Sequence, residues 1–306
     1  MMRILFLNKR TILAAVFIMS GICSVAANAT CDFEGQKLKT FDGAAVKQVW
    51  DDGVASDQCS STPNQYEVTF YKIAICKENP SNNDLTSCRY LVNEDSGVKH
   101  IITKGIESTM SISGFEIEPG TYPYMVSIVS SKLGIKHSFT TTFSVQGSSG
   151  AGTNCWTANP GPSSYTNQSF VSVAHGTTVD HTVQLIDCGV SLGTPVFSYE
   201  VIGKLTGDVC ADAWGDLGDR DTYPAEGAVV SLLDQNNTWA SSCETAAKMF
   251  FVKKNMAAPF LVRPTSLYNL SIKTTDSVSI DFDNGANSNI IKTGADPIQI
   301  RLTINN

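Results

Sequence analysis

The sequence is poor in basic residues, and this scarcity argues against one large class of partner. It has 22 Lys and Arg against 29 Asp and Glu, which gives a formal net charge of −7. Affinity for the phosphate backbone comes from Lys and Arg that displace counterions. We therefore expect no nucleic-acid partner.

Long apolar runs are also lacking after the first 29 residues, and none approaches the ~20 residues that cross a bilayer as a helix. Residues 1–29 themselves have the pattern of a cleavable signal peptide. Three basic residues precede the apolar run Ile12–Ala27, and Ala27-Asn28-Ala29 has the small-x-small form of a cleavage site. We expect export through the general secretory route to the periplasm, the cell surface or the extracellular space, without a membrane span in the mature protein.

Closely spaced cysteine pairs are absent, and this argues against a Cys-rich metal site. Loss of the predicted signal would leave eight of the nine cysteines, an even number that favours disulfides in an oxidising compartment. Four cysteines in each half of the chain permit three pairings, and we predict sequential pairs from loop length. The predicted pairs are Cys31–Cys59, Cys76–Cys88, Cys155–Cys188 and Cys210–Cys243.

Catalytic motifs are missing as well. The sequence has no G-x-S-x-G elbow, no H-E-x-x-H helix and no phosphate-binding glycine loop. We therefore expect a non-catalytic protein. The enzyme alternative is a glycan-active hydrolase, because the separation of a catalytic carboxylate pair is a property of the fold and not of the sequence.

Alternation of apolar and polar residues is what the sequence has in abundance. Ile135–Gln146 alternates with period two, as does the last segment, Ile298–Ile304. Tyr66–Cys76 is apolar on both faces, which predicts a central strand. Ser131–Gly134 is expected to be a hairpin turn. His137 falls on the apolar face of its strand and is expected to be a packed, hydrogen-bonded core residue.

Helices are expected to be few and short, at Ala44–Asp51 and Glu244–Phe251. The fold class that follows is all-β, with two disulfide-stapled β-sandwich domains in tandem, of immunoglobulin-like or jelly-roll-like form. The small and polar residues 147–154 predict a Gly/Ser linker. It would separate an N-terminal domain of residues 30–146 from a C-terminal domain of residues 155–306.

Residues Phe115–Val145, which contain the segment Pro119-Gly120-Thr121-Tyr122, resemble the closing strands of prealbumin-like and immunoglobulin-like modules of bacterial exported proteins. In those modules a Pro-Gly-Thr-Tyr turn opens a long hairpin. The resemblance concerns the first predicted domain and implies a β-sandwich. It implies no activity, because such modules serve as stalks, adhesion units, carbohydrate-binding units and enzyme accessories.

An acidic segment of the second predicted domain contains the candidate site residues. Asp212, Asp216, Asp219 and Asp221 could supply the oxygen ligands that calcium prefers, and calcium is the one cofactor that the sequence suggests. The alternative is a solvated acidic turn. Trp214, in the same segment, is the candidate ligand-binding aromatic, because a ring beside carboxylates can stack on a sugar.

These features favour an exported, non-catalytic binding or structural protein of the bacterial cell surface or periplasm, with a protein or glycan of the envelope as partner. A carbohydrate-binding protein that uses the acidic and tryptophan loop is one alternative. A fibre-forming surface subunit, in which one chain adds a strand to another, is a further alternative.

The calcium hypothesis makes a prediction for thermal unfolding. Millimolar calcium should raise the melting temperature, because a ligand that binds the folded state stabilises it. The rise should vanish in Asp216→Ala and Asp219→Ala. Differential scanning fluorimetry measures it, and the absence of any rise in the wild type would contradict the hypothesis.

Overall fold

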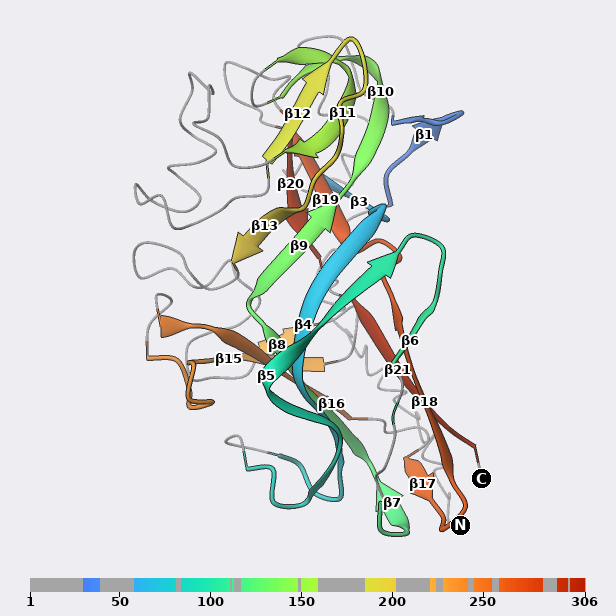
Figure 1. The fold of residues 1–306 in the computed structure, drawn as a ribbon, viewed down its shortest axis with the longest axis vertical. Coiled ribbons are helices and arrows are strands. Elements are labelled where there is room, and N and C mark those ends of the chain that lie inside the picture. Colours follow the sequence, from blue (N-terminus) through green and yellow to red (C-terminus); the bar gives the residue numbers. More distant parts are fainter. Residues whose placement is uncertain are drawn as a thin grey trace, which may run out of the picture.

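The described part of the chain consists mainly of β-strands (Figure 1), which confirms the all-β prediction. The structure is a computed structural model. It describes residues 30–38, 58–80, 84–110, 112, 117–147, 150–158, 185–201, 221–223, 228–241, 245–254, 259–282, 291–296 and 298–305. No helix in these ranges is long and apolar enough to span a membrane.

The strands, in chain order, are β1 (Phe33–Glu34), β2 (Lys37–Leu38), β3 (Gln58–Ser61), β4 (Gln65–Cys76), β5 (Cys88–Thr103), β6 (Ser108–Met110), β7 (Gly120–Tyr122), β8 (Tyr124–Ser130), β9 (Lys132–Lys136), β10 (Ser138–Gln146), β11 (Ala151–Ala158), β12 (Leu185–Gly189), β13 (Ser198–Val201), β14 (Asp221–Tyr223), β15 (Ala228–Leu233), β16 (Lys248–Lys254), β17 (Phe260–Val262), β18 (Leu267–Lys273), β19 (Val278–Phe282), β20 (Ile291–Ala295) and β21 (Gln299–Asn305).

The central strand is β4, and both of its faces are buried, as the sequence predicts. It pairs antiparallel with β5 on one side, and with β8 and then β9 on the other. On one face Tyr66, Val68 and Phe70 enter a large apolar core, and on the other Ala74 and Cys76 enter a smaller one. We call the sheet β13-β9-β4-β8-β16-β15-β14, with β5 added on β4, the large sheet.

The predicted hairpin turn at Ser131–Gly134 is wrong. Both β8 and β9 run antiparallel to β4, so the chain continues in one direction through Ser131. The interruption is a bulge, and the Ser131 amide and hydroxyl each donate a 2.9 Å hydrogen bond to the Ala247 carbonyl. Gly134 serves close packing instead of a turn, because a Cβ there would lie 2.7 Å from the Tyr199 ring.

The predicted helix at Glu244–Phe251 is also wrong in its described part. Residues from Lys248 onward form β16, which pairs with both β15 and β8. Met249 enters the core on one face of the large sheet and Phe250 enters the core on the other. Pairing on both sides outweighs a local helical preference. The second predicted helix, Ala44–Asp51, lies outside the described residues.

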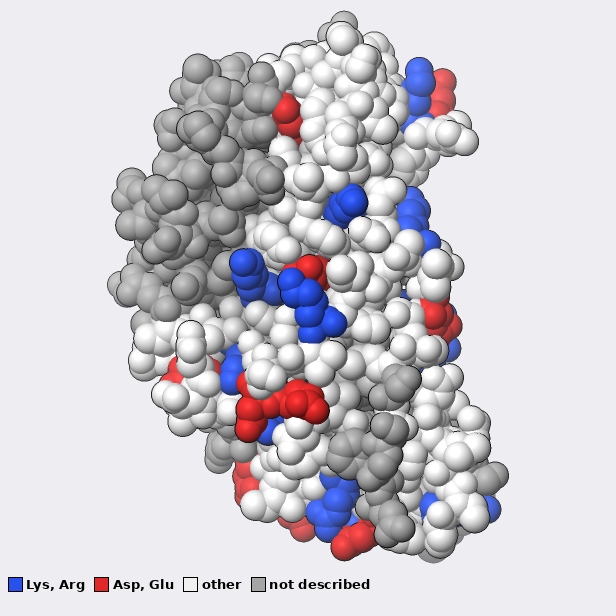
Figure 2. All heavy atoms as spheres, viewed as in Figure 1, with Lys and Arg blue, Asp and Glu red and all other residues white. Residues whose placement is uncertain are grey.

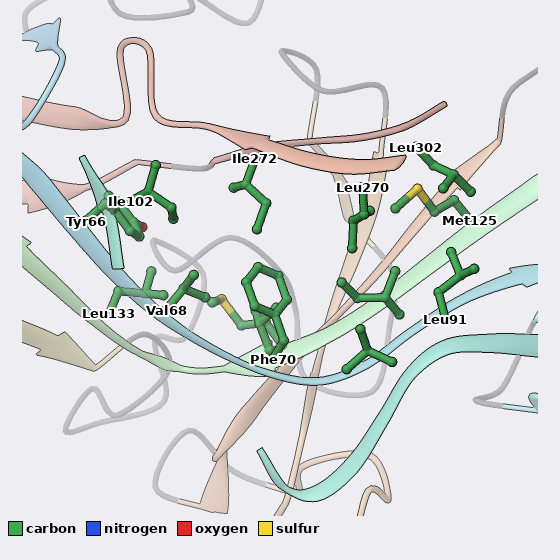
Figure 3. Close-up of a cluster of buried hydrophobic side chains, with 14 of the residues drawn as sticks. Tyr66, Val68, Phe70, Leu91, Ile102, Met125, Leu133, Leu270, Ile272 and Leu302 are labelled. Atoms are coloured by element: carbon green, nitrogen blue, oxygen red, sulfur yellow. The ribbon is translucent and has the colours of Figure 1, made fainter. Parts of the chain in front are cut away.

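The largest core lies between the large sheet and a three-stranded sheet of β21, β18 and β6 (Figure 3). In that figure Tyr66, Val68 and Phe70 of β4 point toward Ile272 and Leu270 of β18. A second core, with Phe139, Cys155 and Ile280 among its residues, involves β10, β11, β12, β19 and β20. Each core therefore draws on residues from both halves of the chain.

Strand pairing also crosses the predicted domain boundary. β8 pairs with β16, β6 with β18 and β3 with β19. Two independent sandwiches of residues 30–146 and 155–306 are therefore not confirmed. The strands form layered sheets, but the sheets are shared between the two halves.

The predicted linker 147–154 overlaps the turn and strand that follow β10. The Gly147 amide donates a 2.7 Å hydrogen bond to the Gly150 carbonyl, and β11 then pairs antiparallel with β10. A Cβ on Gly147 would lie 2.3 Å from the Cys188 nitrogen, and one on Gly152 would lie 2.0 Å from the backbone of Gly189. These two glycines allow two backbone segments to approach closely. Their composition alone predicts a flexible linker instead.

Three of the predicted disulfides are confirmed: Cys31–Cys59, Cys76–Cys88 and Cys155–Cys188. Cys76–Cys88 closes the base of the β4–β5 hairpin, as the sequence predicts. The fourth predicted pair, Cys210–Cys243, lies outside the described residues.

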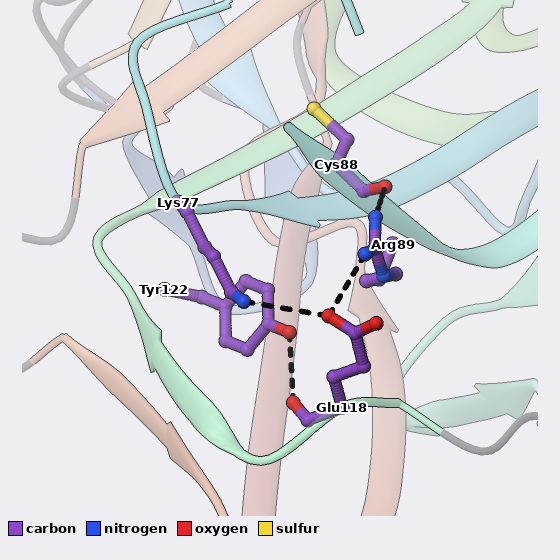
Figure 4. Close-up of polar contacts among 5 residues, drawn as sticks. All are labelled: Lys77, Cys88, Arg89, Glu118 and Tyr122. Atoms are coloured by element: carbon purple, nitrogen blue, oxygen red, sulfur yellow. Dashed lines mark hydrogen bonds and ion pairs between the residues drawn. The ribbon is translucent and has the colours of Figure 1, made fainter. Parts of the chain in front are cut away.

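The Pro119–Tyr122 turn is fastened to that hairpin by a polar cluster (Figure 4). The buried Tyr122 donates its hydroxyl to the Glu118 carbonyl at 2.8 Å. The Glu118 carboxylate lies 2.9 Å from the Arg89 guanidinium and 3.5 Å from the Lys77 ammonium. These cations, Arg89 first, lower the pKa of Glu118. A tyrosine hydroxyl bonded to backbone a few residues upstream also occurs at the corners of immunoglobulin-like sandwiches.

The shared core predicts a large difference between two leucines of β18. Leu270 is fully buried against β4, whereas Leu267 is 70% exposed. Leu270→Ala should lower the free energy of unfolding by about 2–5 kcal/mol, through lost burial and the cavity left behind. Leu267→Ala should change it by less than about 0.5 kcal/mol. Urea denaturation measures both, and equal effects would contradict the assigned core.

Candidate functional site

Most of the site residues proposed from the sequence lie outside the described residues: Asp212, Trp214, Asp216 and Asp219. Asp221 begins β14, where its backbone is opposite Val230 of β15. In the described ranges, no three His, Cys, Asp or Glu side chains are grouped as metal ligands. The calcium site remains a prediction.

The described residues do form a polar groove of about 690 Å³ on the large sheet. It lies on the face opposite the largest core. Its floor contains Tyr71 of β4, Ser130 of β8 and Lys248 of β16. The loop between β15 and β16 lines one part and a bulge of β5 lines another.

Lys248 stabilises the loop beside the groove. Its side chain is largely buried, and its ammonium donates hydrogen bonds to the Gln235 carbonyl at 3.0 Å and the Asn237 Oδ1 at 2.8 Å. The same ammonium lies 4.5 Å from the centre of the Tyr71 ring. Burial lowers the pKa of Lys248. These contacts make Lys248 a positioning residue that holds the loop against the floor.

Asp234 organises the loop from within. Its carboxylate accepts hydrogen bonds from the amide of Asn236 at 2.8 Å, and from the amide and hydroxyl of Thr238 at 2.9 and 2.8 Å. Such bonds are typical of Asx turns, and those from Thr238 are the main cause of the lowered pKa of Asp234. Asn237 adopts a positive φ of 62° within the turn. Gln235 and Asn236 stay exposed and line the groove.

One wall of the groove is a bulge of β5, which forms where the pairing register of the β4–β5 hairpin shifts. Lys72 pairs with Asn93 and Phe70 pairs with Val98, so four residues of β5 lie opposite Tyr71 alone. Gly97 makes this bulge possible, since it has a φ of +77° and a Cβ would lie 2.5 Å from Thr69. The bulge projects Asp95, whose side chain is 94% exposed and 3.5 Å from the Lys72 ammonium.

The groove can both donate and accept hydrogen bonds. Carboxylates, amides, hydroxyls and ammonium groups all line it, together with one tyrosine ring. Figure 2 shows Lys and Arg side chains beside Asp and Glu side chains on the face that it presents, instead of a patch of one sign. Such a lining suits a polar, hydrogen-bonding ligand better than an apolar one.

Sequence patterns do not indicate this groove, because its residues extend from Tyr71 to Lys248 and meet only through strand pairing. Two local signals exist. Asp234-Gln235-Asn236-Asn237 is a turn-forming run, and Lys248 is a charged residue at the start of the apolar segment Met249–Val252. A lysine before an apolar strand indicates a site only after the fold shows its neighbours.

His137 is a buried core residue, as the sequence predicts, and it lies between β9 and β10. Its Nδ1 is 3.1 Å from the Asn64 Oδ1, which also accepts the Ser138 amide. Because an amide oxygen accepts, Nδ1 carries the proton of the neutral ring. The Nε2 atom is buried without a hydrogen-bond partner among the described residues. Burial, with a smaller contribution from the Lys104 ammonium, lowers the pKa of His137 to about 3.

This histidine predicts a loss of stability in acid. The folded-state pKa of about 3 lies below the ordinary value of 6.5, so the unfolded chain binds the proton more tightly. The stability is fully present above pH 6.5 and declines as the pH falls toward 3, by about 3 kcal/mol at pH 4. His137→Asn keeps a donor for Asn64 without this titration and should flatten the decline.

Denaturant unfolding at several pH values between 7 and 4 measures this difference. His100→Asn is the control, because His100 is half-buried and its Nε2 has Ser108 as a partner at 2.7 Å. The control should leave most of the acid dependence in place. An unchanged pH dependence in His137→Asn would contradict the assignment.

Comparisons with known proteins provide no further guide to the site. The chain matches no protein-family model, no curated protein and no solved structure. The function is therefore argued from the geometry of the groove and from the chemistry of its residues.

Proposed function

We propose that this chain is an exported, non-catalytic binding protein of the bacterial cell envelope, and that the groove beside Tyr71 and Lys248 is its binding surface. The observation that carries the proposal is the groove itself. Both of its walls are held in place before any ligand arrives, one by the Lys248 and Asp234 hydrogen bonds and the other by the β5 bulge. Preformed polar sites bind at a lower entropic cost.

The disulfides support the proposed export to an oxidising compartment. Three disulfides lie within the described residues. Such bonds persist in oxidising compartments and are rare in the cytosol. Together with the signal-like residues 1–29, they favour export.

The binding role is supported by how three titratable groups of the groove are used. Lys248 and Asp234 both bond to the β15–β16 loop, and Asp95 pairs with Lys72. Each has a structural partner, whereas a general acid or base must be within reach of a substrate proton. These groups shape a surface for recognition.

A groove-filling variant tests the proposal. Ser96→Trp places a large ring in the groove from the exposed β5 bulge. It should weaken binding of the full protein to purified peptidoglycan sacculi and outer-membrane vesicles of the source bacterium by about tenfold or more, by occupying the site. Sedimentation of the protein with each envelope fraction measures this affinity.

The control is Thr303→Trp, at an exposed position of β21 on a different sheet. It should bind as the wild type does. Failure of the wild type to bind either fraction, or equal binding by Ser96→Trp, would overturn the proposal.

A further inference from the structure

Beyond the groove the large sheet continues toward β13, and Lys132 contacts both the groove and β13. Lys132 lines the groove, and its ammonium also lies 4.4 Å from the centre of the Tyr199 ring. Tyr199 is opposite Gly134 of β9, which is in turn opposite Glu67 of β4. Glu67 and Tyr71 are four residues apart on one strand, or about 13 Å. The combined surface is therefore long enough for a chain of several units.

Glycine makes the second part of this surface flat. A Cβ on Gly134 would lie 2.7 Å from the Tyr199 ring and 3.1 Å from the Glu67 Cβ. Without that carbon, the ring lies close over the sheet. Gly97 has the same effect beside Tyr71, where a Cβ would lie 3.0 Å from the ring. The rings of Tyr71 and Tyr199 thus both lie close to the sheet. Lys132 lines the groove and also contacts Tyr199.

Three lysines of this surface have polar partners among the described residues. Lys99 lies 2.8 Å from the Glu67 carboxylate and Lys72 lies 3.5 Å from Asp95. Lys248 donates to two oxygens of the loop. Lys132 is exposed and, among the described residues, faces the Tyr199 ring without a carboxylate partner.

The carboxylates around the groove do not supply that partner. Asp234 accepts three hydrogen bonds from its own loop, and Asp95 is paired with Lys72. Glu67 is paired with Lys99, and it raises the pKa of Tyr199 after the larger effect of burial. A ligand that brings its own anion would complete the charge balance at Lys132.

We propose that this surface binds a saccharide chain that carries carboxylate groups, with one carboxylate on Lys132 and the sugars beside Tyr71 and Tyr199. The tyrosine rings offer apolar contact to the C–H groups of sugars, and the amides and hydroxyls of the groove suit the sugar hydroxyls. An ammonium beside an aromatic ring gives the carboxylate a charge-assisted hydrogen bond. The inference rests on the proposed function and names the ligand class of the same groove.

The test compares acidic oligosaccharides with their uncharged methyl esters. The probes are hexasaccharides of galacturonate, of mannuronate and of hyaluronan, each alongside its methyl ester, titrated into the full protein by calorimetry. At least one acidic probe should bind about tenfold more tightly than its ester. Raising the salt from 0.05 to about 0.5 M should reduce that difference, because salt screens exposed charges.

Variants test whether Lys132 causes the preference for the acidic probe over its ester. Lys132→Gln should weaken binding of the acidic probe about tenfold and leave the ester unchanged, while Lys132→Arg should retain the preference. Tyr199→Ala should weaken both probes, whereas Phe143→Ala, an exposed aromatic of β10, should weaken neither. Lys273→Gln removes the same charge from the opposite sheet and should have no effect.

The outcomes separate this inference from the proposed function. If Ser96→Trp blocks envelope binding but no acidic oligosaccharide binds, or if hexaglutamate binds as well as they do, the saccharide inference is overturned and the binding role stands. If Lys132→Gln leaves the preference for acid over ester intact, the assignment of Lys132 is overturned. If the wild type binds neither envelope nor oligosaccharide, both proposals fail.

Discussion

The structure depends on the burial of both faces of β4. Its alternate residues Tyr66, Val68 and Phe70 must be covered on one side, and Ala74 and Cys76 on the other. Neighbouring strands of the N-terminal half supply the pairing for its edges, but they cannot cover its faces. The cover for the first face comes from β18 and β21, about 200 residues later in the chain. This requirement unites the two halves of the sequence in one core.

The groove arises where β4 and its partners fall out of register. Four residues of β5 lie opposite Tyr71, and Ser131 interrupts the run from β8 to β9. Bulges re-aim side chains and end regular pairing, and they are frequent next to functional sites. Here they leave part of the outward face of the sheet uncovered by apolar side chains. Lys248 then holds a polar loop at the margin of that opening.

Sequence patterns predicted the features that depend on local alternation and on cysteine spacing. The two-faced apolar run of β4, the closing strand β21 and three disulfides belong to this group. The failures share a cause. The bulge at Ser131, the strand at Lys248 and the close approach at Gly147 all depend on partners distant in the sequence: Ala247, β8 and Cys188.

The candidate site could not be predicted from the sequence for the same reason. The acidic segment around Asp216 stands out because its charges are adjacent in the chain, whereas Tyr71, Lys132 and Lys248 become neighbours through pairing on β8, β9 and β16. A cluster made by topology has no local composition signal. What the sequence could show was a polar residue at the edge of an apolar run, which is common in strands that have no binding role.

Native-state hydrogen exchange is the most direct test of the shared core. Amides of β4, β8, β16 and β18 should be protected with similar free energies and should lose protection together as denaturant is added, because they belong to one cooperative unit. If the amides of β16 and β18 instead exchange with their own free energy, independent of those of β4 and β8, the two halves fold separately and the shared core is contradicted.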